Sequence, residues 1–585
     1  MLKLKHLKGG FNSLYKKERV IFYFFAILLC LSFLSIIIRL NNRFLVAIPE
    51  DGGSITEGII GTPTLVNPVL AITDADKDLV ELVYSGLLRK GANGDYIPDL
   101  AESYTISPDG TIYTFILKDN LTFHDGSPVT ANDVVFTINK IQDPLIKSPR
   151  KIQWEGVTSE VKDSKTIVFT LKQPYISFLN NATVGILPTN IWKNITPVEF
   201  GLSNLNIKGI GSGPYMISSV DHTSEGIPNV YNLKRFKEFA LGSPHIKKFV
   251  IKSYSNEKEL VQNLKKGNID QAGGISPLLA DTISTNDARI ITSILPRSFG
   301  IYFNQGANKY FADLTIRKAI DLGVDRAGII DEVLKGYGSI INSPISANKK
   351  SGNQSTDADT FDQNRDSAIS LLEKGGWKVG SDGIREKGNT STITTGKGKN
   401  KKTVQVEKGP KTRLAFTITT GDTPELTETA ELIKDNMRAI GIEVNVKVYE
   451  TGALNQIIRT RDYEALLFGQ VVNSESDMFA FWHSSQRNDP GLNIALYNNQ
   501  AMDILLEQIQ KILPQEEKQK KYDNLETLFK NDIPAVFIYS PEYIYAVSKK
   551  LNLHESLTTT FPKDRFASVY LWFTESDMIW KIFSK

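Results

Sequence analysis

Residues 99–140 constrain this chain most, because they describe a compact α/β unit element by element. The segment 107–110, Ser-Pro-Asp-Gly, predicts a tight turn, since proline presets φ and glycine accepts a positive φ. Residues 111–118 place their aromatic side chains on alternate positions and predict a strand. The pattern Thr-Ala-Asn-Asp at 130–133 is an acidic form of the capping box and predicts the start of a helix with an apolar inner face. The stretch therefore predicts an α/β unit, and these elements alone name no function.

Short motifs in and after this region occur in a characteristic order. The string P-x-L-A-E-S at 98–103 and the turn at 107–110 precede F-H-D-G-x-P-x-T-A-x-D-V at 123–134, and G-S-G-P-Y follows at 211–215. In this order they resemble the family 5 extracellular solute-binding proteins, which deliver dipeptides, oligopeptides and other solutes to ABC importers. A lone Pro-Asp-Gly turn would carry no such meaning, but the ordered series does.

The resemblance implies an α/β fold of the large two-lobed periplasmic-binding-protein type, with two strands crossing between the lobes and an extra small domain. We expect lobe 1 at residues 54–88, 205–298 and 535–585, the small domain at 89–204, and lobe 2 at 299–534. Residues 388–411 are rich in Gly, Thr and Lys and have few apolar side chains. This composition predicts a flexible, solvated loop inserted in lobe 2.

The N-terminus carries an uncharged apolar run at residues 20–38. A helix of this length crosses a hydrocarbon core of about 30 Å. Six Lys and Arg side chains precede the run, which predicts a cytoplasmic tail at 1–19, a transmembrane anchor at 20–40 and a spacer at 41–53 leading to an extracytoplasmic main domain. A cleaved signal peptide is the alternative, although its apolar core would be shorter. Periplasm and cell surface both stay open as the location.

Composition narrows the class of protein. The chain of 585 residues is too long for one core, and its formal net charge of +3 lacks the basic excess of a nucleic-acid-binding protein. A single cysteine, Cys30, excludes an intrachain disulfide. Cys30 follows Leu29 in mid-span, so it does not match the cysteine through which many family members carry a lipid anchor.

The ligand is expected between the lobes. In peptide-binding members of the family an aspartate after a strand of lobe 2 pairs with the α-amino group of the peptide, and alignment on Phe479 places Val472 there. Valine cannot compensate a buried ammonium. Whether Glu475 or Asp477 takes that role stays open, and the ligand could instead be a neutral sugar or an N-blocked peptide. We expect six residues to line the site: Tyr302, Asn304, Gln470, Val472, Asn473 and Trp482.

Three functions were weighed. The resemblance and the anchor favour a membrane-tethered, monomeric receptor that closes around a peptide-like or other small solute and delivers it to the permease subunits of an ABC transporter. A ligand-sensing or interaction protein with the same fold is the alternative. A hydrolase is disfavoured because no spacing marks an acid–base pair, and the sequence implies no catalytic residue, cofactor, metal site or nucleic-acid partner. His124, in the His-Asp-Gly turn, is expected at the surface, and His483 is the one histidine of the cleft stretch.

Overall fold

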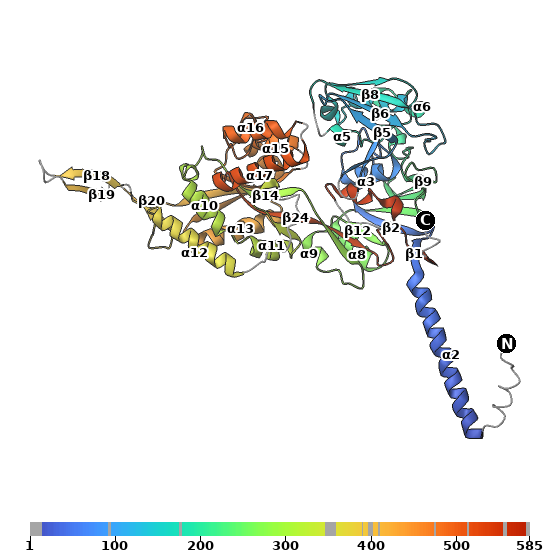
Figure 1. Cartoon of the computed structure of the whole chain (residues 1–585). Helices are drawn as coiled ribbons and strands as arrows, with labels where there is room; N and C mark the ends of the chain where they lie inside the picture. Colours follow the sequence, from blue (N-terminus) through green and yellow to red (C-terminus); the bar gives the residue numbers. More distant parts are fainter. Residues whose placement is uncertain are drawn as a thin grey trace.

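The structure is a computed structural model of the whole chain. It describes residues 15–580 except 92–94, 175–177, 346–357, 389, 396–401, 408–409, 473–474, 512–513 and 554–558. Two lobes lie side by side, with a small domain above lobe 1 and a long helix below it (Figure 1). This is the two-lobed α/β architecture that the resemblance implied.

One large sheet runs through both lobes. Its strand order is β22-β21-β23-β14-β24-β12-β2-β11-β10-β9, and β13 and β15 also pair with β24. The strands of lobe 1 are β2 (Gly52–Ile60), β9 (Tyr215–His222), β10 (Pro228–Arg235), β11 (Ile246–Tyr254) and β12 (Gln271–Gly273). Its helices are α3 (Asp74–Val83), α8 (Glu257–Lys265), α9 (Pro277–Ala280), η7 (Pro562–Phe566) and η8 (Val569–Leu571).

The lobes are joined where β13 (Arg289–Ile294) and β14 (Arg297–Phe303) run antiparallel to β24 (Ala535–Val547). The first half of β24 pairs with β14 in lobe 2 and its second half pairs with β13 and β12 in lobe 1. The expected start of lobe 1 at residue 535 therefore falls too early. All thirteen residues of β24 form one strand that is mostly buried, so nothing local in the sequence marks the change of partner.

The small domain carries the unit that the sequence described. A four-stranded sheet is formed by β5 (Ala101–Ile106), β6 (Ile112–Leu117), β7 (Val157–Val161) and β8 (Thr166–Leu171), beside a β3 (Leu88–Lys90) and β4 (Tyr96–Pro98) pair. Helix α4 (Ala131–Gln142) begins after Thr130, whose N–H donates to the Asp133 carboxylate at 2.9 Å, as the capping box predicted. The short helices are η1 (Lys151–Trp154), α5 (Phe178–Asn181), α6 (Thr189–Trp192), α7 (Pro197–Phe200) and η2 (Asn204–Asn206). One hydrophobic core joins this domain to lobe 1.

Lobe 2 contains the parallel strand–helix–strand unit β21 (Ala415–Gly421), α13 (Pro424–Ala439) and β22 (Glu443–Tyr449), with β23 (Ala465–Val471) beside β14. Its other helices are η3 (Lys309–Ala312), α10 (Leu314–Gly323), α11 (Arg326–Leu334), α12 (Ala358–Lys374), α14 (Thr451–Thr460), α15 (Glu475–Trp482), η6 (Ser484–Gln486), α16 (Gln500–Ile509) and α17 (Gln515–Asp532). Short strands are β15 (Gly338–Ile340), β16 (Lys378–Val379), β17 (Arg385–Lys387) and β20 (Thr412–Arg413).

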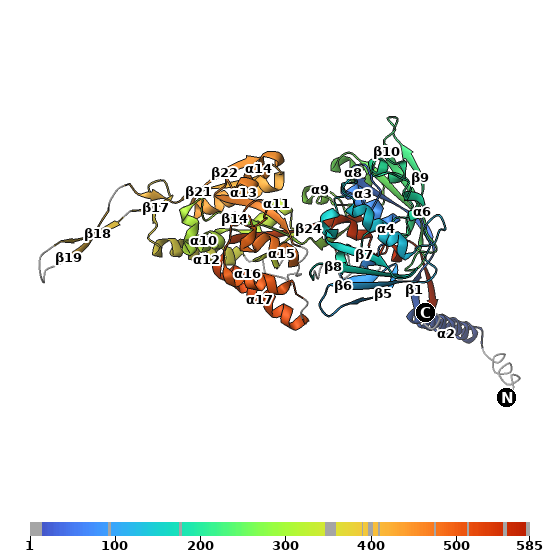
Figure 2. The same cartoon turned by 90° about the horizontal axis from the view of Figure 1, so that it is seen from above.

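The insertion in lobe 2 is a hairpin, and the expectation of a loop is wrong for its strands. β18 (Thr390–Thr395) and β19 (Lys402–Glu407) pair antiparallel from Thr390↔Glu407 to Thr395↔Lys402. The hairpin extends away from the rest of lobe 2 (Figure 2). The physical reason is that Thr and Val favour extended backbone, and our expectation considered only the low content of apolar residues.

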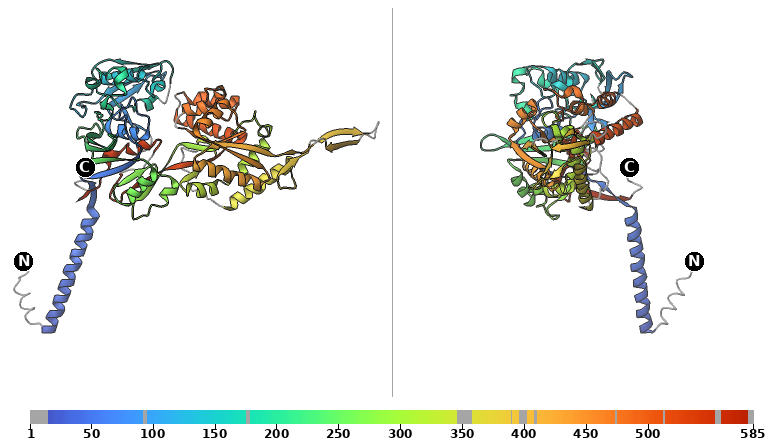
Figure 3. Two further views of the ribbon diagram at one scale, coloured as in Figure 1. Left: turned by 180° about the vertical axis from the view of Figure 1, so that it is seen from behind. Right: turned by 90° about the vertical axis from the view of Figure 1, so that its left-hand side faces the viewer.

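The N-terminal helix α2 (Lys16–Phe44) continues directly into β1 (Leu45–Pro49). β1 pairs antiparallel with β25 (Ser576–Trp580) near the C-terminus, and only two residues separate β1 from β2. The expected spacer at 41–53 is thus helix and strand instead. Sequence alone does not reveal this pairing, because its two strands lie at opposite ends of the chain. Helix α2 stands clear of both lobes (Figure 3).

His124 fastens the small domain to lobe 1 and is not the surface residue that we expected. Its Nδ1 accepts from the Gly211 N–H at 3.3 Å, its Nε2 donates to the Gly213 carbonyl at 3.0 Å, and its ring packs edge-on to Phe236. The bond from Gly211 needs the neutral ring, because a protonated Nδ1 cannot accept a hydrogen bond. Burial accordingly lowers the pKa of His124 to about 4.

We expect this histidine to make stability depend on pH. Because the folded pKa lies below the unfolded value of about 6.5, the stabilisation is complete above pH 6.5 and is lost as the pH falls towards the folded pKa, by up to about 1.4 kcal/mol per unit. Urea unfolding at a series of pH values measures it. His124→Asn should flatten the dependence, whereas the exposed control His222→Gln should keep it; equal slopes in all three proteins would contradict the assignment.

Candidate ligand-binding site

The residues that the sequence proposed for the cleft lie on β14, β23, α15 and the segments that follow them. Asn473 lies outside the described residues. The others are at most 5% exposed: Tyr302, Asn304, Gln470, Val472 and Trp482. None of the five presents an open surface in this conformation, so their contact with a ligand stays a prediction.

Three of these residues have packing or backbone roles that account for their burial. Tyr302 and Trp482 pack against each other with ring centroids 6.0 Å apart, inside the second core of lobe 2. The Asn304 amide donates to the Arg461 carbonyl at 3.0 Å and accepts from the N–H groups of Gly306 and Ala307, which holds the loop after β14. For Tyr302 and Trp482 these contacts are those of core side chains. Core packing is the alternative to ligand contact for any buried aromatic residue.

Some buried polar atoms in this region lack a partner. Gln470 lies opposite Ser298 across β23 and β14, and within the described part of the chain the Gln470 Oε1, Ser298 Oγ and Trp482 Nε1 atoms make no hydrogen bond. Buried polar atoms are normally paired with protein or water. A water or a ligand group that entered here would satisfy them, so this end of β23 keeps its place as a candidate contact region.

Other residues of the stretch are less suited to ligand contact. The side chain of Glu475 is outside the described part, and Asp477 is half-buried. His483 caps η6: its Nδ1 accepts from the Ser485 N–H at 3.1 Å while its ring stacks on Phe479 at 4.1 Å. Among the described residues, no group of three or more His, Cys, Asp and Glu side chains could hold a metal ion.

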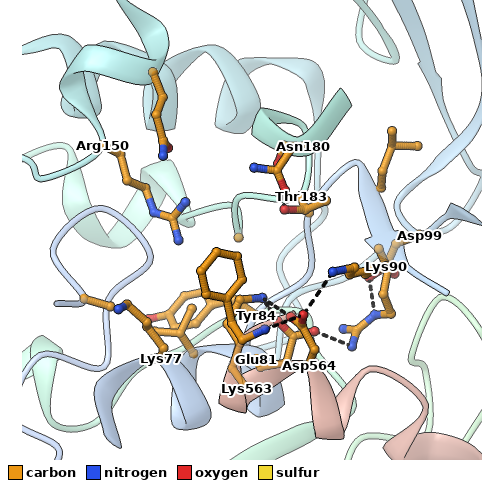
Figure 4. Close-up of a pocket in the computed structure, with 18 of the residues that line it drawn as sticks. Lys77, Glu81, Tyr84, Lys90, Asp99, Arg150, Asn180, Thr183, Lys563 and Asp564 are labelled. Carbon is orange, nitrogen blue, oxygen red and sulfur yellow. Dashed lines mark hydrogen bonds and ion pairs between the residues drawn. The ribbon is translucent and has the colours of Figure 1, made fainter. Parts of the chain in front are cut away.

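A well-formed cavity lies elsewhere, between lobe 1 and the small domain. It has a volume of about 330 Å³ and is lined by α3, the start of β3, α5, η7 and the segment before η1. Arg150, Asn180 and Thr183 of the small domain lie on one side, and Lys77, Glu81 and Lys563 of lobe 1 lie opposite (Figure 4). Small-molecule sites have volumes of this order and above.

Glycine at 86 allows the walls of this cavity to meet. A Cβ at Gly86 would lie 2.7 Å from the Thr183 carbonyl group, which belongs to backbone and cannot move aside cheaply. The close approach brings α5 against the start of β3, and so positions the small-domain wall over α3. Backbone packing therefore fixes the junction between lobe 1 and the small domain, and the polar side chains of the cavity project from fixed positions.

A network of ion pairs forms the lobe 1 wall. Glu81 accepts from Arg89 at 2.9 Å and from Lys563 at 2.8 Å; Arg89 also pairs with Asp99 at 3.0 Å, and Lys90 pairs with Asp564 at 3.1 Å. Burial alone would raise the pKa of Glu81, but Lys563 and Arg89 hold the pKa below its usual range. These carboxylates are therefore already engaged by cations of their own wall.

Arg150 differs from the other cationic side chains of the cavity because it lacks an ion-pair partner among the described residues. Among the described residues, no ion pair or hydrogen bond is made by its guanidinium, and its Nε is buried. Burial lowers the pKa of Arg150, and Glu81 acts in the opposite sense. Burying an unpaired charge is costly, so this side chain is a candidate for ligand contact.

Comparison with known proteins decides the family. The sequence profile of the bacterial extracellular solute-binding proteins, family 5, matches residues 95–491, which is more than half of the chain. This chain belongs to that family. The oligopeptide-binding protein AppA of Bacillus subtilis is 28% identical over 511 residues, with 86% of this chain and 89% of AppA covered. The nickel-binding periplasmic protein of Escherichia coli is 26% identical over 419 residues, covering 69% and 72%.

Solved structures agree on the fold. AppA in complex with a nonapeptide superimposes with a TM-score of 0.62 at 26% identity, over 90% of this chain and 100% of AppA. The murein tripeptide-binding protein MppA in its unliganded open form superimposes with a TM-score of 0.71 at 16% identity, over 90% and 98%. The relatives bear solute-binding names and none of these names is that of an enzyme. The chain is thus a solute-binding protein of the class that serves ABC importers.

Sequence reasoning missed the cavity. Arg150 follows a Ser-Pro pair and Lys563 lies in Pro-Lys-Asp-Arg, and neither string is a recognisable binding motif. The two side chains are more than four hundred residues apart in the chain and line one cavity because the small domain and η7 both pack on lobe 1. The expectation that Val472 replaces the family's aspartate concerns lobe 2 and stays a prediction.

Proposed function

We propose that this protein is a membrane-tethered, extracytoplasmic receptor that captures a small solute between its lobes and delivers it to the permease subunits of an ABC importer. Membership of the family carries the proposal. The relatives that bind oligopeptides, murein tripeptide or nickel set the range of solutes to test. The cavity beside α3 is the lobe 1 half of the proposed site, and the end of β23 is the other half.

The arrangement of the lobes supports closure around a ligand. The chain superimposes better on the unliganded open MppA than on AppA with its bound nonapeptide, with TM-scores of 0.71 and 0.62, although AppA is closer in sequence. This difference in TM-score is expected if the two lobes stand apart in this structure. They would then close about the crossing strands β13, β14 and β24 when ligand binds. Closure would bring lobe 2 over the cavity and exclude water from it.

We expect ligand binding to make the molecule more compact. Small-angle X-ray scattering of the full chain in detergent, with and without saturating ligand, measures the radius of gyration, and a thermal melt of the same samples measures stability. A ligand at 100 times its dissociation constant adds about 2.7 kcal/mol. Free tripeptides, N-acetylated tripeptides and oligosaccharides form the first panel. Stabilisation without compaction would contradict hinge closure, and absence of any binder would favour the alternative of an interaction protein.

Helix α2 supports the tether. An 18-residue window within Lys16–Asn41 has a mean hydropathy of 2.8 and none of it is buried in the protein, so its surface suits a lipid environment. Its direct connection to β1, and the pairing of β1 with β25, would hold lobe 1 close to the membrane. The basic residues before the apolar run favour a cytoplasmic position for residues 1–19 under the positive-inside rule.

We expect the helix to remain on the mature protein. Alkaline extraction of membranes should leave the chain in the pellet, because a spanning helix resists conditions that release peripheral proteins. The intact mass should include residues 1–44. A soluble product that begins after the helix would show that α2 is a cleaved signal and would overturn the anchor.

A further inference from the structure

The lining charges of the cavity between lobe 1 and the small domain do not balance. Five cationic side chains face it against three carboxylates, Glu81, Asp99 and Asp564. All three carboxylates are paired with Arg89, Lys90 or Lys563. Lys77 pairs with Asp74 at 3.7 Å on its own helix, so the positive charge that the wall leaves uncompensated is that of Arg150.

Arg150 carries the excess on the small-domain side. Figure 4 shows its guanidinium directed into the cavity, across from Lys563 and Glu81. Its positive charge opposes the protonated form of Lys563, whose pKa is nevertheless raised by Glu81 and Asp564 against the effect of burial. Glu81 acts on both cations, but it is already paired with Lys563 and Arg89, so the charge of Arg150 favours an additional anion in the cavity.

The neutral polar side chains near Arg150 also suit an anionic ligand. Asn180 and Thr183 lie beside Arg150 on the small-domain wall. A side-chain amide and a guanidinium are both hydrogen-bond donors, and a guanidinium binds a carboxylate or a phosphate through two parallel hydrogen bonds. The volume of about 330 Å³ admits one end of a small solute.

Lobe 2 offers the complementary observation. Val472, which the resemblance places at the family's amine-binding position, is buried and apolar. A ligand whose main charge is an ammonium would lose its usual partner there, while an anionic ligand would lose nothing. The two lobes therefore point to the same sign of ligand charge.

We propose that the cavity binds the anionic group of the solute, a carboxylate or a phosphate, through Arg150, so that this receptor recognises its ligand by a negative end. The inference rests on the proposed function and names the ligand class for that site. Arg150 contacts the ligand directly, and Lys563 with the ion-pair network holds the opposite wall.

Isothermal titration calorimetry of the full chain in detergent tests the proposal with matched probes. The acid N-acetyl-trialanine carries a carboxylate and no ammonium, its C-terminal amide is neutral, trialanine amide is cationic, and inorganic phosphate represents the second source. We expect the acid to bind at least about tenfold more tightly than either amide. Phosphate binding without acid binding would assign the site to phosphate esters.

The matched variants are Arg150→Met and Lys151→Met. Lys151 is the next residue, is exposed and does not line the cavity. We expect Arg150→Met to weaken the anionic probe about tenfold to a hundredfold and to leave the amides unchanged. It should also melt at a higher temperature than the wild type without ligand, because a half-buried, unpaired charge is removed. Lys151→Met should change none of these measurements.

Several outcomes would overturn the inference. They are equal binding of acid and amide, unchanged binding by Arg150→Met, or a lower melting temperature of Arg150→Met with equal losses for all probes, which is the mark of a structural role. If free peptides or oligosaccharides bind while the anionic probes do not, the anion site fails and the receptor function stands. If no solute of either panel binds, the receptor function itself fails.

Discussion

Replacing Arg565 by methionine is expected to destabilise lobe 1 by about 3–5 kcal/mol, because it leaves two buried carboxylates without their cation. The Arg565 Nε donates to Glu57 at 2.9 Å, and its Nη1 donates to Asp78 at 2.8 Å. Side chains of all three residues are at most 5% exposed. Tyr545 also donates to Glu57 at 2.8 Å, so four segments that are distant in the chain, β2, α3, β24 and η7, meet at this cluster.

The measurement is urea unfolding combined with hydrogen exchange read peptide by peptide. Hydrogen exchange assigns the loss to a lobe, which matters because a chain with several cores need not unfold in one step. Faster exchange in β2, α3 and η7, with lobe 2 unchanged, is the expected pattern. An unaltered exchange rate in lobe 1 would show that the cluster contributes little.

Two further variants test whether the loss of stability comes from the buried charge or would follow the replacement of any arginine. Arg413 pairs with Glu443 at 2.6 Å and also with Asp382, but its side chain is 39% exposed, so Arg413→Met should cost at most about 1 kcal/mol. Adding Glu57→Gln and Asp78→Asn to Arg565→Met should restore part of the lost stability, since the uncompensated charges are then removed. A rescue that fails would point to packing of the Arg565 stem instead.

The Arg565 cluster also bears on the ligand site. Lys563 and Asp564, which line the cavity, precede Arg565 in η7, and Arg565 fastens η7 to α3 through Asp78. Loosening that contact should therefore widen the cavity and weaken ligand binding along with stability. This coupling distinguishes Arg565 from Arg150, whose removal should weaken binding while it raises stability.

Local patterns in the sequence predicted local structure well. The turn at 107–110, β6 and the start of α4 depend on a few adjacent residues, and the structure has all three as expected. β21 and β22 pair in parallel, as strands joined through a helix usually do. Family resemblance then supplied the two-lobed arrangement, which no local pattern contains.

Features that depend on residues far apart in the chain were not predictable in this way. The pairing of β1 with β25 joins Leu45 to Trp580, and the cavity brings Arg150 to Lys563. Such contacts are set by how whole lobes pack, and no short window carries them. The buried cluster of Arg565 is similar: a Lys-Asp-Arg string predicts exposed charge, and only packing against Glu57 and Asp78 makes it internal.

Aromatic residues were the weakest part of the site prediction. Trp482 suits a ligand-stacking wall and a hydrophobic core equally well by sequence. In the structure its ring lies 4.7 Å from that of Phe529 and 5.8 Å from that of Phe537, and the side chain is 1% exposed. These contacts favour the core.

Trp482→Ala is accordingly expected to destabilise lobe 2 by about 3–5 kcal/mol, as large-to-small changes at buried aromatic positions do. Urea unfolding and hydrogen exchange of β23, α15 and α17 measure the loss. Trp482→Phe should cost less, because much of the volume remains. Phe479→Ala is the matched control: Phe479 is half-buried on the same helix and stacks on His483 at 4.1 Å, so its loss should be clearly smaller.

A ligand-stacking role for Trp482 predicts different changes in affinity and stability for Trp482→Ala. If Trp482 stacks on ligand, Trp482→Ala should lower affinity while stability without ligand changes by less than about 1 kcal/mol. If it belongs to the core, stability falls without ligand, and Trp482→Phe keeps most of the affinity. Comparing the two variants in the melt and in the titration therefore decides which side of α15 meets the solute, and whether recognition depends chiefly on the cavity of lobe 1.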